Sequence, residues 1–113
     1  MIKGLKERVQ ELSVSLPLME GREKGELKSL YMDKITIRDF GFLKDGEEEY
    51  VAFIIDEDKE NFYFGGMVLT DNMKQLEADG YRTEIEKDGL PIRLSEKKGK
   101  NNRVYTKVEY YPE

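Results

Sequence analysis

The sequence predicts a mainly β domain over residues 34–113, preceded by an N-terminal helix and linker over residues 1–33. Apolar and polar residues alternate with a period of two in several segments, which is typical of half-buried strands. Turn-forming residues separate these segments. The length of 113 residues allows one hydrophobic core and leaves little room for a second domain.

The first 15 residues have the spacing of a short amphipathic helix. Pro17 ends the pattern, because a residue before proline is driven out of helical geometry. Residues 20–25 are polar and contain two glycines, so a loop is expected there. Residues 26–32 fit either a helical turn or a strand. The apolar residues of the expected helix recur three or four positions apart, and they are Ile2, Leu5, Val9 and Leu12.

The first strand of the domain, over residues 34–42, is expected to change face along its length. Its apolar residues Ile35 and Ile37 occupy odd positions, whereas Phe40 and Phe42 occupy even positions. A slip of one residue within a strand indicates a bulge or a sharp bend, and a glycine lies at this slip, at position 41. Such a strand can serve two parts of a curled sheet.

Two strands and a helix are expected next. Residues 50–55 and 61–68 are rich in β-branched and aromatic residues, and a charged turn separates them. Residues 70–79 are predicted to form a helix that Thr70 caps and Gly80 ends. The apolar surface of this helix is small. We therefore expect the helix to close one end of a barrel and not to cover the face of a sheet.

The last third of the chain is expected to contain a connector and a hairpin. Residues 81–89 form the connector, with a short strand over residues 82–85. Residues 90–94 and 104–110 alternate polar and apolar side chains and are predicted to be strands. The turn over residues 99–102 contains glycine and asparagine, which tolerate positive φ.

The order strand, strand, strand, helix, strand, strand is that of the OB-fold, a five-stranded Greek-key barrel. The bulged first strand, the small helix and the size of the domain agree with this fold. The alternatives are another small β-barrel and an antiparallel sheet with one helix on its face. The fold alone does not decide function, so a site has to be identified from its residues.

The composition excludes several classes of function. The chain contains no cysteine and no histidine, which removes thiol nucleophiles, zinc–thiolate sites and the commonest general base. Its carboxylates form no recognisable acid–base constellation, so we expect a protein without catalytic residues, metal site or cofactor. No apolar run approaches the roughly 20 residues that a membrane span needs, and no signal peptide is evident. We therefore expect a cytoplasmic protein that does not bind membranes.

The strongest candidate site is the last hairpin. Between Leu90 and Val108, six basic residues and one acid give a net charge of +5, in a chain whose net charge is −5. Cations that contact a phosphate chain release its counterions, and an exposed ring beside them can stack on a base. The alternative is a solvated hairpin whose charges protect an edge strand. The candidate residues are Arg93, Lys97, Lys98, Lys100, Asn101, Arg103, Tyr105 and Lys107.

Aromatic residues on the expected second and third strands form a second candidate site, because these strands carry the usual OB binding face. Phe53, Phe62 and Phe64 are expected to lie in the core. Tyr63 has the opposite parity and could stack on a base, with Arg38 of the first strand beside it. The alternative for Tyr63 is ordinary cross-strand packing.

Residues 44–60 form an acidic stretch with eight acids and two lysines. This stretch would repel phosphates, so it favours a binding site on one side of the molecule only. It could instead bind a basic partner. Asp56, Glu57 and Asp58 lack the glycine and the spacing of a calcium loop, so a metal is not expected here.

Five segments carry a resemblance to known proteins, and they are 37–42, 49–53, 61–66, the helix start at 69–70, and 103–106. Through them, residues 34–111 resemble small OB-type proteins, similar to single-stranded-DNA-binding proteins, from phages and mobile elements of Gram-positive bacteria. The resemblance implies DNA binding during replication or recombination. Bacterial single-strand-binding proteins typically end in a long acidic tail that recruits partners, whereas this sequence ends at Glu113 without one, which puts such a hub role in doubt.

The sequence therefore leads to two hypotheses. In the first, a non-enzymatic module binds single-stranded nucleic acid, ssDNA in particular, through the last hairpin and one aromatic ring. In the second, the protein is an interaction module that binds a protein partner or a second copy through its acidic loops or the helix over residues 1–15.

Overall fold

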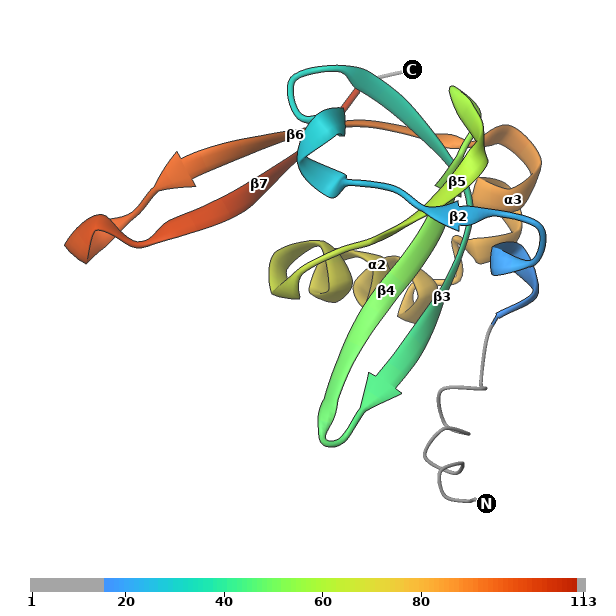
Figure 1. Ribbon diagram of the computed structural model, residues 1–113, viewed down its shortest axis with the longest axis horizontal. Coiled ribbons are helices and arrows are strands. Elements are labelled where there is room, and N and C mark those ends of the chain that lie inside the picture. Colours follow the sequence, from blue (N-terminus) through green and yellow to red (C-terminus); the bar gives the residue numbers. More distant parts are fainter. Residues whose placement is uncertain (1–15, 112–113) are drawn as a thin grey trace.

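The computed structural model describes residues 16–111, and its fold is mainly β, as predicted. The expected helix over residues 1–15 lies outside the described residues. Figure 1 shows a twisted sheet with two helices packed on it and two hairpins that extend from its body. The elements are the strands β2 (Glu23–Lys24), β3 (Lys34–Asp45), β4 (Glu48–Ile55), β5 (Asp58–Phe64), β6 (Leu90–Lys98) and β7 (Val104–Tyr110), the helices α2 (Met67–Ala78) and α3 (Arg82–Asp88), and the 3-10 turns η1 (Pro17–Met19), η2 (Leu27–Leu30) and η3 (Lys100–Asn102).

The sheet is six-stranded, mixed and open, with the order β2-β5-β4-β3-β6-β7. Strand β2 pairs with β5 in parallel, and the other pairs are antiparallel. The closed barrel expected from the sequence is not formed within residues 16–111, because β5 and β7 do not pair. Its two edges are instead β2 and β7.

The segment over residues 25–33 contacts strands on both sides of the opening. Gly25 N donates to Phe62 O of β5 at 2.8 Å, and Met32 N donates to Leu94 O of β6 at 2.8 Å, where the chain enters β3. The Tyr31 hydroxyl lies 2.8 Å from Thr106 Oγ1 of β7. Chain that was expected to be a linker therefore occupies the place where a barrel would close.

Strand β3 contains the predicted irregularity. Its register against β4 shifts between Ile37 and Asp39, so the bulge lies near Arg38, slightly before the expected position at Gly41. Before the bulge β3 pairs with β6, and after it β3 pairs with β4 alone. The bulge lets one strand serve two parts of the sheet, which allows both odd-numbered Ile37 and even-numbered Phe40 to be buried.

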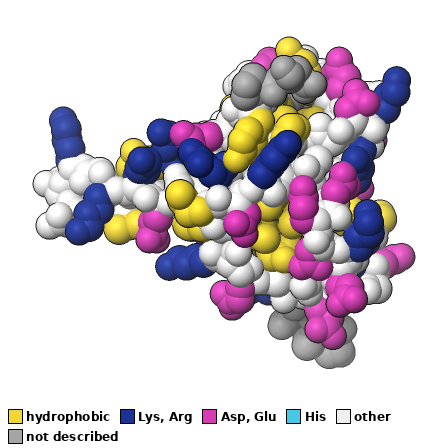
Figure 2. Space-filling model, turned by 90° about the horizontal axis from the view of Figure 1, so that it is seen from above, with side chains coloured by type: hydrophobic (Ala, Val, Ile, Leu, Met, Phe, Trp, Pro, Cys, Tyr) yellow, Lys and Arg dark blue, Asp and Glu magenta, His cyan; other side chains and the backbone are white. Residues whose placement is uncertain are grey.

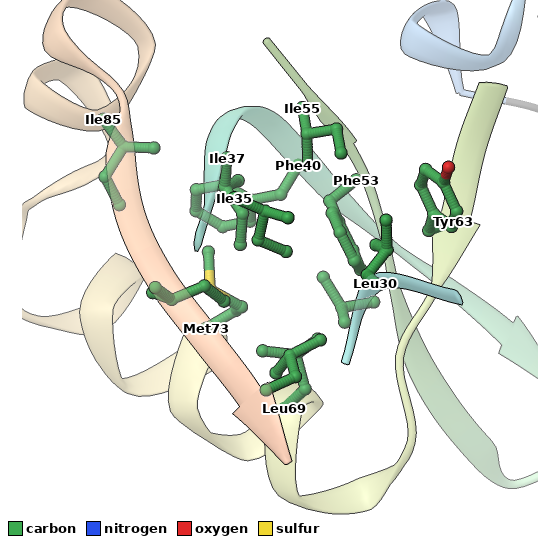
Figure 3. Packing of buried hydrophobic residues seen from close by; sticks show 13 residues of the cluster. Leu30, Ile35, Ile37, Phe40, Phe53, Ile55, Tyr63, Leu69, Met73 and Ile85 are labelled. Atoms are coloured by element: carbon green, nitrogen blue, oxygen red, sulfur yellow. The ribbon is translucent and has the colours of Figure 1, made fainter. Parts of the chain in front are cut away.

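The core consists of two clusters of buried side chains. The main cluster lies between the sheet, α2, α3 and η2 (Figure 3), and includes Leu30, Phe53 and Tyr63. The second cluster contains Phe62 of β5 and Leu18 of η1. Since neighbouring residues of a strand point to opposite faces, Tyr63 joins the first cluster and Phe62 the second. Residues 16–33 thus contribute to both clusters rather than forming a linker.

The helical part of the chain differs from its prediction in two ways. Helix α2 begins three residues earlier than expected, at Met67, and Gly66 is its N-cap. Thr70 lies inside the helix, where its buried Oγ1 accepts a hydrogen bond from Val51 N of β4 at 3.0 Å. The short strand expected over residues 82–85 is instead part of α3, which buries Ile85 against the main cluster. No helix within residues 16–111 is long and apolar enough to cross a membrane.

Candidate nucleic-acid interface

Strands β6 and β7 form an antiparallel ribbon that projects from the body of the molecule (Figure 1). We call residues 96–107 of this ribbon the arm. Its tip turns through η3, where Asn101 and Asn102 adopt positive φ values of 62° and 61°. Asparagine tolerates this left-handed region better than most residues, so the turn forms where the sequence predicted it. Gly99 N closes the turn by donating to Arg103 O at 2.6 Å.

The register of the ribbon decides which side chains share a face. Residues directly opposite each other in an antiparallel pair lie on the same face. Lys97 lies opposite Tyr105, and Ser95 lies opposite Lys107. Arg103, which directly precedes β7 in extended conformation, and Lys107 of β7 each lie two residues from Tyr105, so they share its face, as the sequence predicted. Lys98 lies opposite Val104 on the other face.

The six cations of the hairpin fall into two groups. At its base, Arg93 donates to Glu109 Oε1 through Nε at 3.0 Å and Nη2 at 2.7 Å. This hydrogen bonding holds the pKa of the Glu109 carboxyl below its usual range, so the pair stays ionised and its charges cancel. Lys107 Nζ lies 3.5 Å from the other Glu109 oxygen. In the described part of the chain, the more distal cations form no ion pair, and they are Lys97, Lys98, Lys100 and Arg103.

The surface of the arm contrasts with that of the body. Figure 2 shows Lys and Arg side chains along the projecting arm, whereas most Asp and Glu side chains lie over the body. Glu96 is the one acid of the arm, and it lies 3.8 Å from Lys28. The predicted concentration of positive charge on this hairpin is therefore present at its distal end, and not at its base.

Tyr105 is the exposed ring of the arm. It is 47 % exposed, and the neighbouring Val104 is 54 % exposed. A Cβ atom added to Gly99 would lie 3.4 Å from Tyr105 Cε1, so the ring packs beside the glycine backbone. Gly99, Lys100, Asn101, Arg103, Val104 and Tyr105 line an open hollow at the tip. Val104 was not expected in the site, although its position between Arg103 and Tyr105 at a hairpin tip is a signal that could have found it.

Tyr63 does not provide a second stacking surface. It is 3 % exposed, and its ring stacks on Phe53 with a centroid distance of 5.8 Å. Its hydroxyl donates to Asp58 Oδ2 at 2.6 Å. Burial and this carboxylate raise the pKa of Tyr63 to about 12. The alternative of cross-strand packing therefore describes Tyr63, because the ring lies on the face of β5 that η2 covers.

Arg38 belongs to a different part of the molecule from the arm. Its Nε and Nη2 donate to the two oxygens of Asp56 at 3.0 and 2.6 Å, and its Nη1 donates to Lys87 O at 2.8 Å. Hydrogen bonding from Arg38 lowers the pKa of Asp56. The guanidinium thus connects the β4–β5 turn to the end of α3, and its charge is offset by Asp56.

The acids of residues 44–60 also divide into two groups. Those of the β4–β5 turn have structural partners, since Glu57 accepts hydrogen bonds from Thr36 and Asp58 accepts them from Tyr63 and Asn61. Those of the β3–β4 turn, including Asp45, Glu47 and Glu48, are exposed at the tip of the second projecting hairpin. No group of three acids within residues 16–111 converges as metal ligands would.

No family model, curated protein or solved structure matches this chain.

Proposed function

We propose that this protein binds single-stranded nucleic acid, with ssDNA as its ligand, and that it does so without catalysis. The arm is the binding site. The observation that carries the proposal is that the projecting ribbon carries an exposed tyrosine and four cations that have no ion-pair partner in the described structure, of which Lys97 and Arg103 share the face of Tyr105. Lysine and arginine would contact the phosphates, and the Tyr105 ring would stack on a base.

The distribution of charge favours a single strand on one side of the molecule. The exposed acids of the β3–β4 turn would repel a phosphate chain that left the arm and wrapped around the body. Asn101 and Asn102 at the tip add hydrogen-bonding groups that could contact bases or sugars. A base inside a duplex cannot stack on Tyr105, because both of its faces are already stacked on its neighbours, so this contact favours a single strand.

The order of the strands supports an OB-like origin of this sheet. Along the chain, the strands β3, β4, β5, β6 and β7 follow the predicted order, with α2 between β5 and β6. Residues 25–33 lie where β5 and β7 would pair in a closed barrel. With ssDNA as ligand, we place the protein in the replication or recombination of a phage or mobile element, as the resemblance implies.

Fluorescence anisotropy with labelled oligo-dT tests the proposal. We expect binding that weakens as salt concentration rises, because each neutralised phosphate releases counterions. The double substitution Lys98→Glu and Lys100→Glu should abolish binding at moderate salt. The double substitution Lys59→Glu and Lys87→Glu is the matched control, since it changes the net charge equally at two exposed lysines outside the arm. This control should keep most of the affinity.

Substitution of Tyr105 separates stacking from charge. Tyr105→Leu should weaken binding by about 1–3 kcal/mol and leave the salt dependence unchanged, because base stacking involves no counterions. If wild-type protein does not bind at low salt, or if both double variants bind equally well, the arm is not a nucleic-acid site. Absence of binding would favour the interaction module, in which the exposed β3–β4 turn binds a basic protein.

A further inference from the structure

The outer edge of β7 is open along the arm. Strand β7 is the last strand of the sheet, and among the described residues it pairs with β6 alone. Its C-terminal end lies near α2, where the Tyr110 hydroxyl donates to Asn72 Oδ1 at 2.9 Å. The rest of the strand projects with the arm, away from the helices (Figure 1). An open edge can accept another strand, because its backbone groups have no partner.

The hydrogen bonds at the two ends of β7 show which of its residues face outward. Arg103 O accepts from Gly99 N, and Tyr111 N donates to Pro91 O, so both odd-numbered residues point toward β6. The pairing between them runs without a register shift. Backbone groups alternate between the two edges of a strand. The N–H and C=O groups of Val104, Thr106 and Val108 therefore point to the open edge.

The sequence of β7 is complementary to itself around Thr106. Two antiparallel copies that meet at this residue would bring Arg103 of one copy opposite Glu109 of the other. Val104, which is 54 % exposed, would face Val108, and Tyr105 would face Lys107. The first pair has opposite charges, the second is apolar, and the third places an ammonium beside a ring. Both members of each pair lie on the same face of the extended sheet.

The open edge and the self-complementary sequence agree on one register. Pairing centred on Thr106 brings the outward-facing residues 104, 106 and 108 opposite residues 108, 106 and 104 of the second copy. These are the positions that exchange backbone hydrogen bonds in an antiparallel ladder. Lysines on an edge strand usually prevent its pairing with another strand. In this register, Lys107 of one copy would lie opposite Tyr105 of the other copy and not opposite a second lysine. We infer that the partner of this edge is a second copy of the chain, which forms a two-fold dimer through β7.

Sedimentation velocity of the full chain, without nucleic acid, tests this inference. Wild-type protein should shift from monomer to dimer as its concentration rises. Thr106→Pro should stay monomeric, because proline removes the outward N–H at the centre while leaving the bonds to β6 intact. Thr106→Ala is the matched control: it removes the hydroxyl that contacts Tyr31 but keeps the N–H, so it should dimerise like wild type. A wild type that is monomeric at every concentration would overturn the inference.

Hydrogen exchange of the wild-type amides provides a test that needs no variant. The outward amides of Val104, Thr106 and Val108 should exchange at least tenfold more slowly at dimer-forming concentration than in dilute protein. The inward amides of Tyr105 and Lys107 should be protected at both concentrations. Equal protection of the outward amides at both concentrations would show that any dimer uses another surface. These measurements contain no oligonucleotide, so their outcome is independent of whether the arm binds nucleic acid.

Discussion

The arginines and lysines of this protein differ in whether a carboxylate pairs with them. Arg38 forms a bidentate interaction with both oxygens of Asp56, and Arg93 donates two hydrogen bonds to one oxygen of Glu109. Lys98 and Lys100 have no ion-pair partner within residues 16–111. An arginine already held by a carboxylate would have to exchange that partner for a phosphate. We therefore expect Arg93 to stabilise the base of the hairpin, and the distal lysines to contribute most of the affinity for a phosphate chain.

Tyr63 has properties that its position in the sequence does not show. Its ring is buried against Phe53, and its hydroxyl donates to Asp58 at 2.6 Å. Burial disfavours the phenolate first, and the Asp58 carboxylate disfavours it further, which together raise the pKa of Tyr63 to about 12 from a usual value of 10.0. The same hydrogen bond lowers the pKa of Asp58.

The Tyr63 pKa predicts how stability changes at alkaline pH. Above pH 10.0 an unfolded tyrosine loses its proton, whereas folded Tyr63 keeps it until about pH 12. The unfolded state therefore binds fewer protons in this window, and the free energy of unfolding should fall as pH rises through it. Ultraviolet titration of phenolate absorbance should show a tyrosine that ionises near pH 12, and Tyr63→Phe should remove that step. Identical titration curves for both proteins would contradict the assignment.

At the scale of elements, the junction between β5 and α2 depends on one glycine. A Cβ atom at Gly65 would lie 2.7 Å from Val51 Cγ1 and 2.8 Å from Leu69 Cδ2, and both of these side chains are fully buried. Gly66 has no atom within 4 Å of the corresponding position. Gly65 thus lets the helix start close to β4, while Gly66 serves as the N-cap of α2.

The two glycines form a matched pair for a stability measurement. Gly65→Ala should lower the free energy of unfolding by about 1–3 kcal/mol, because the added methyl group overpacks a core that cannot move easily. Gly66→Ala should have a smaller effect, limited to the poorer N-cap, which costs a few tenths to about 1 kcal/mol. Urea denaturation of both variants measures the difference. Equal losses would show that the junction tolerates a side chain at position 65.

At the scale of the whole molecule, residues 16–33 decide the shape of the sheet. They add β2 to the outer edge of β5 and place η2 in the gap between β5 and β7. Figure 3 shows Leu30 beside Phe53 and Tyr63 in the main cluster. The segment thus covers the side of the main cluster that pairing between β5 and β7 would cover in a closed barrel. The outer edge of β7 remains open.

Substitution of Leu30 measures the contribution of this segment. Leu30→Ala should lower the free energy of unfolding by about 2–4 kcal/mol through lost burial and a cavity, with a single cooperative transition. Lys28→Ala, at an exposed neighbouring position, should change it by less than about 0.5 kcal/mol. Chemical denaturation followed by circular dichroism gives both values. A negligible loss for Leu30→Ala would mean that the sheet is stable without this segment.

The β-strands could be predicted because their signal is local. Alternation of apolar and polar residues identified β3, β6 and β7, and the change of parity in β3 identified its bulge within a few residues. The helix α3 was missed because its seven residues bury only Ile85, so they carry almost no helical periodicity. The parity of Phe62 and Tyr63 was correct, but alternation alone could not show that both faces of β5 are covered.

The mainly β class, the order of the strands after residue 34 and the clustering of cations on the last hairpin could be predicted from the sequence, because each of these depends on residues close together in the chain. Long-range packing leaves the sheet open, buries Tyr63 and gives Arg38 and Arg93 their carboxylate partners. Those outcomes depend on residues far apart in the chain. Whether a side chain is covered or its charge offset is set by the segments that pack beside it, which local patterns do not contain.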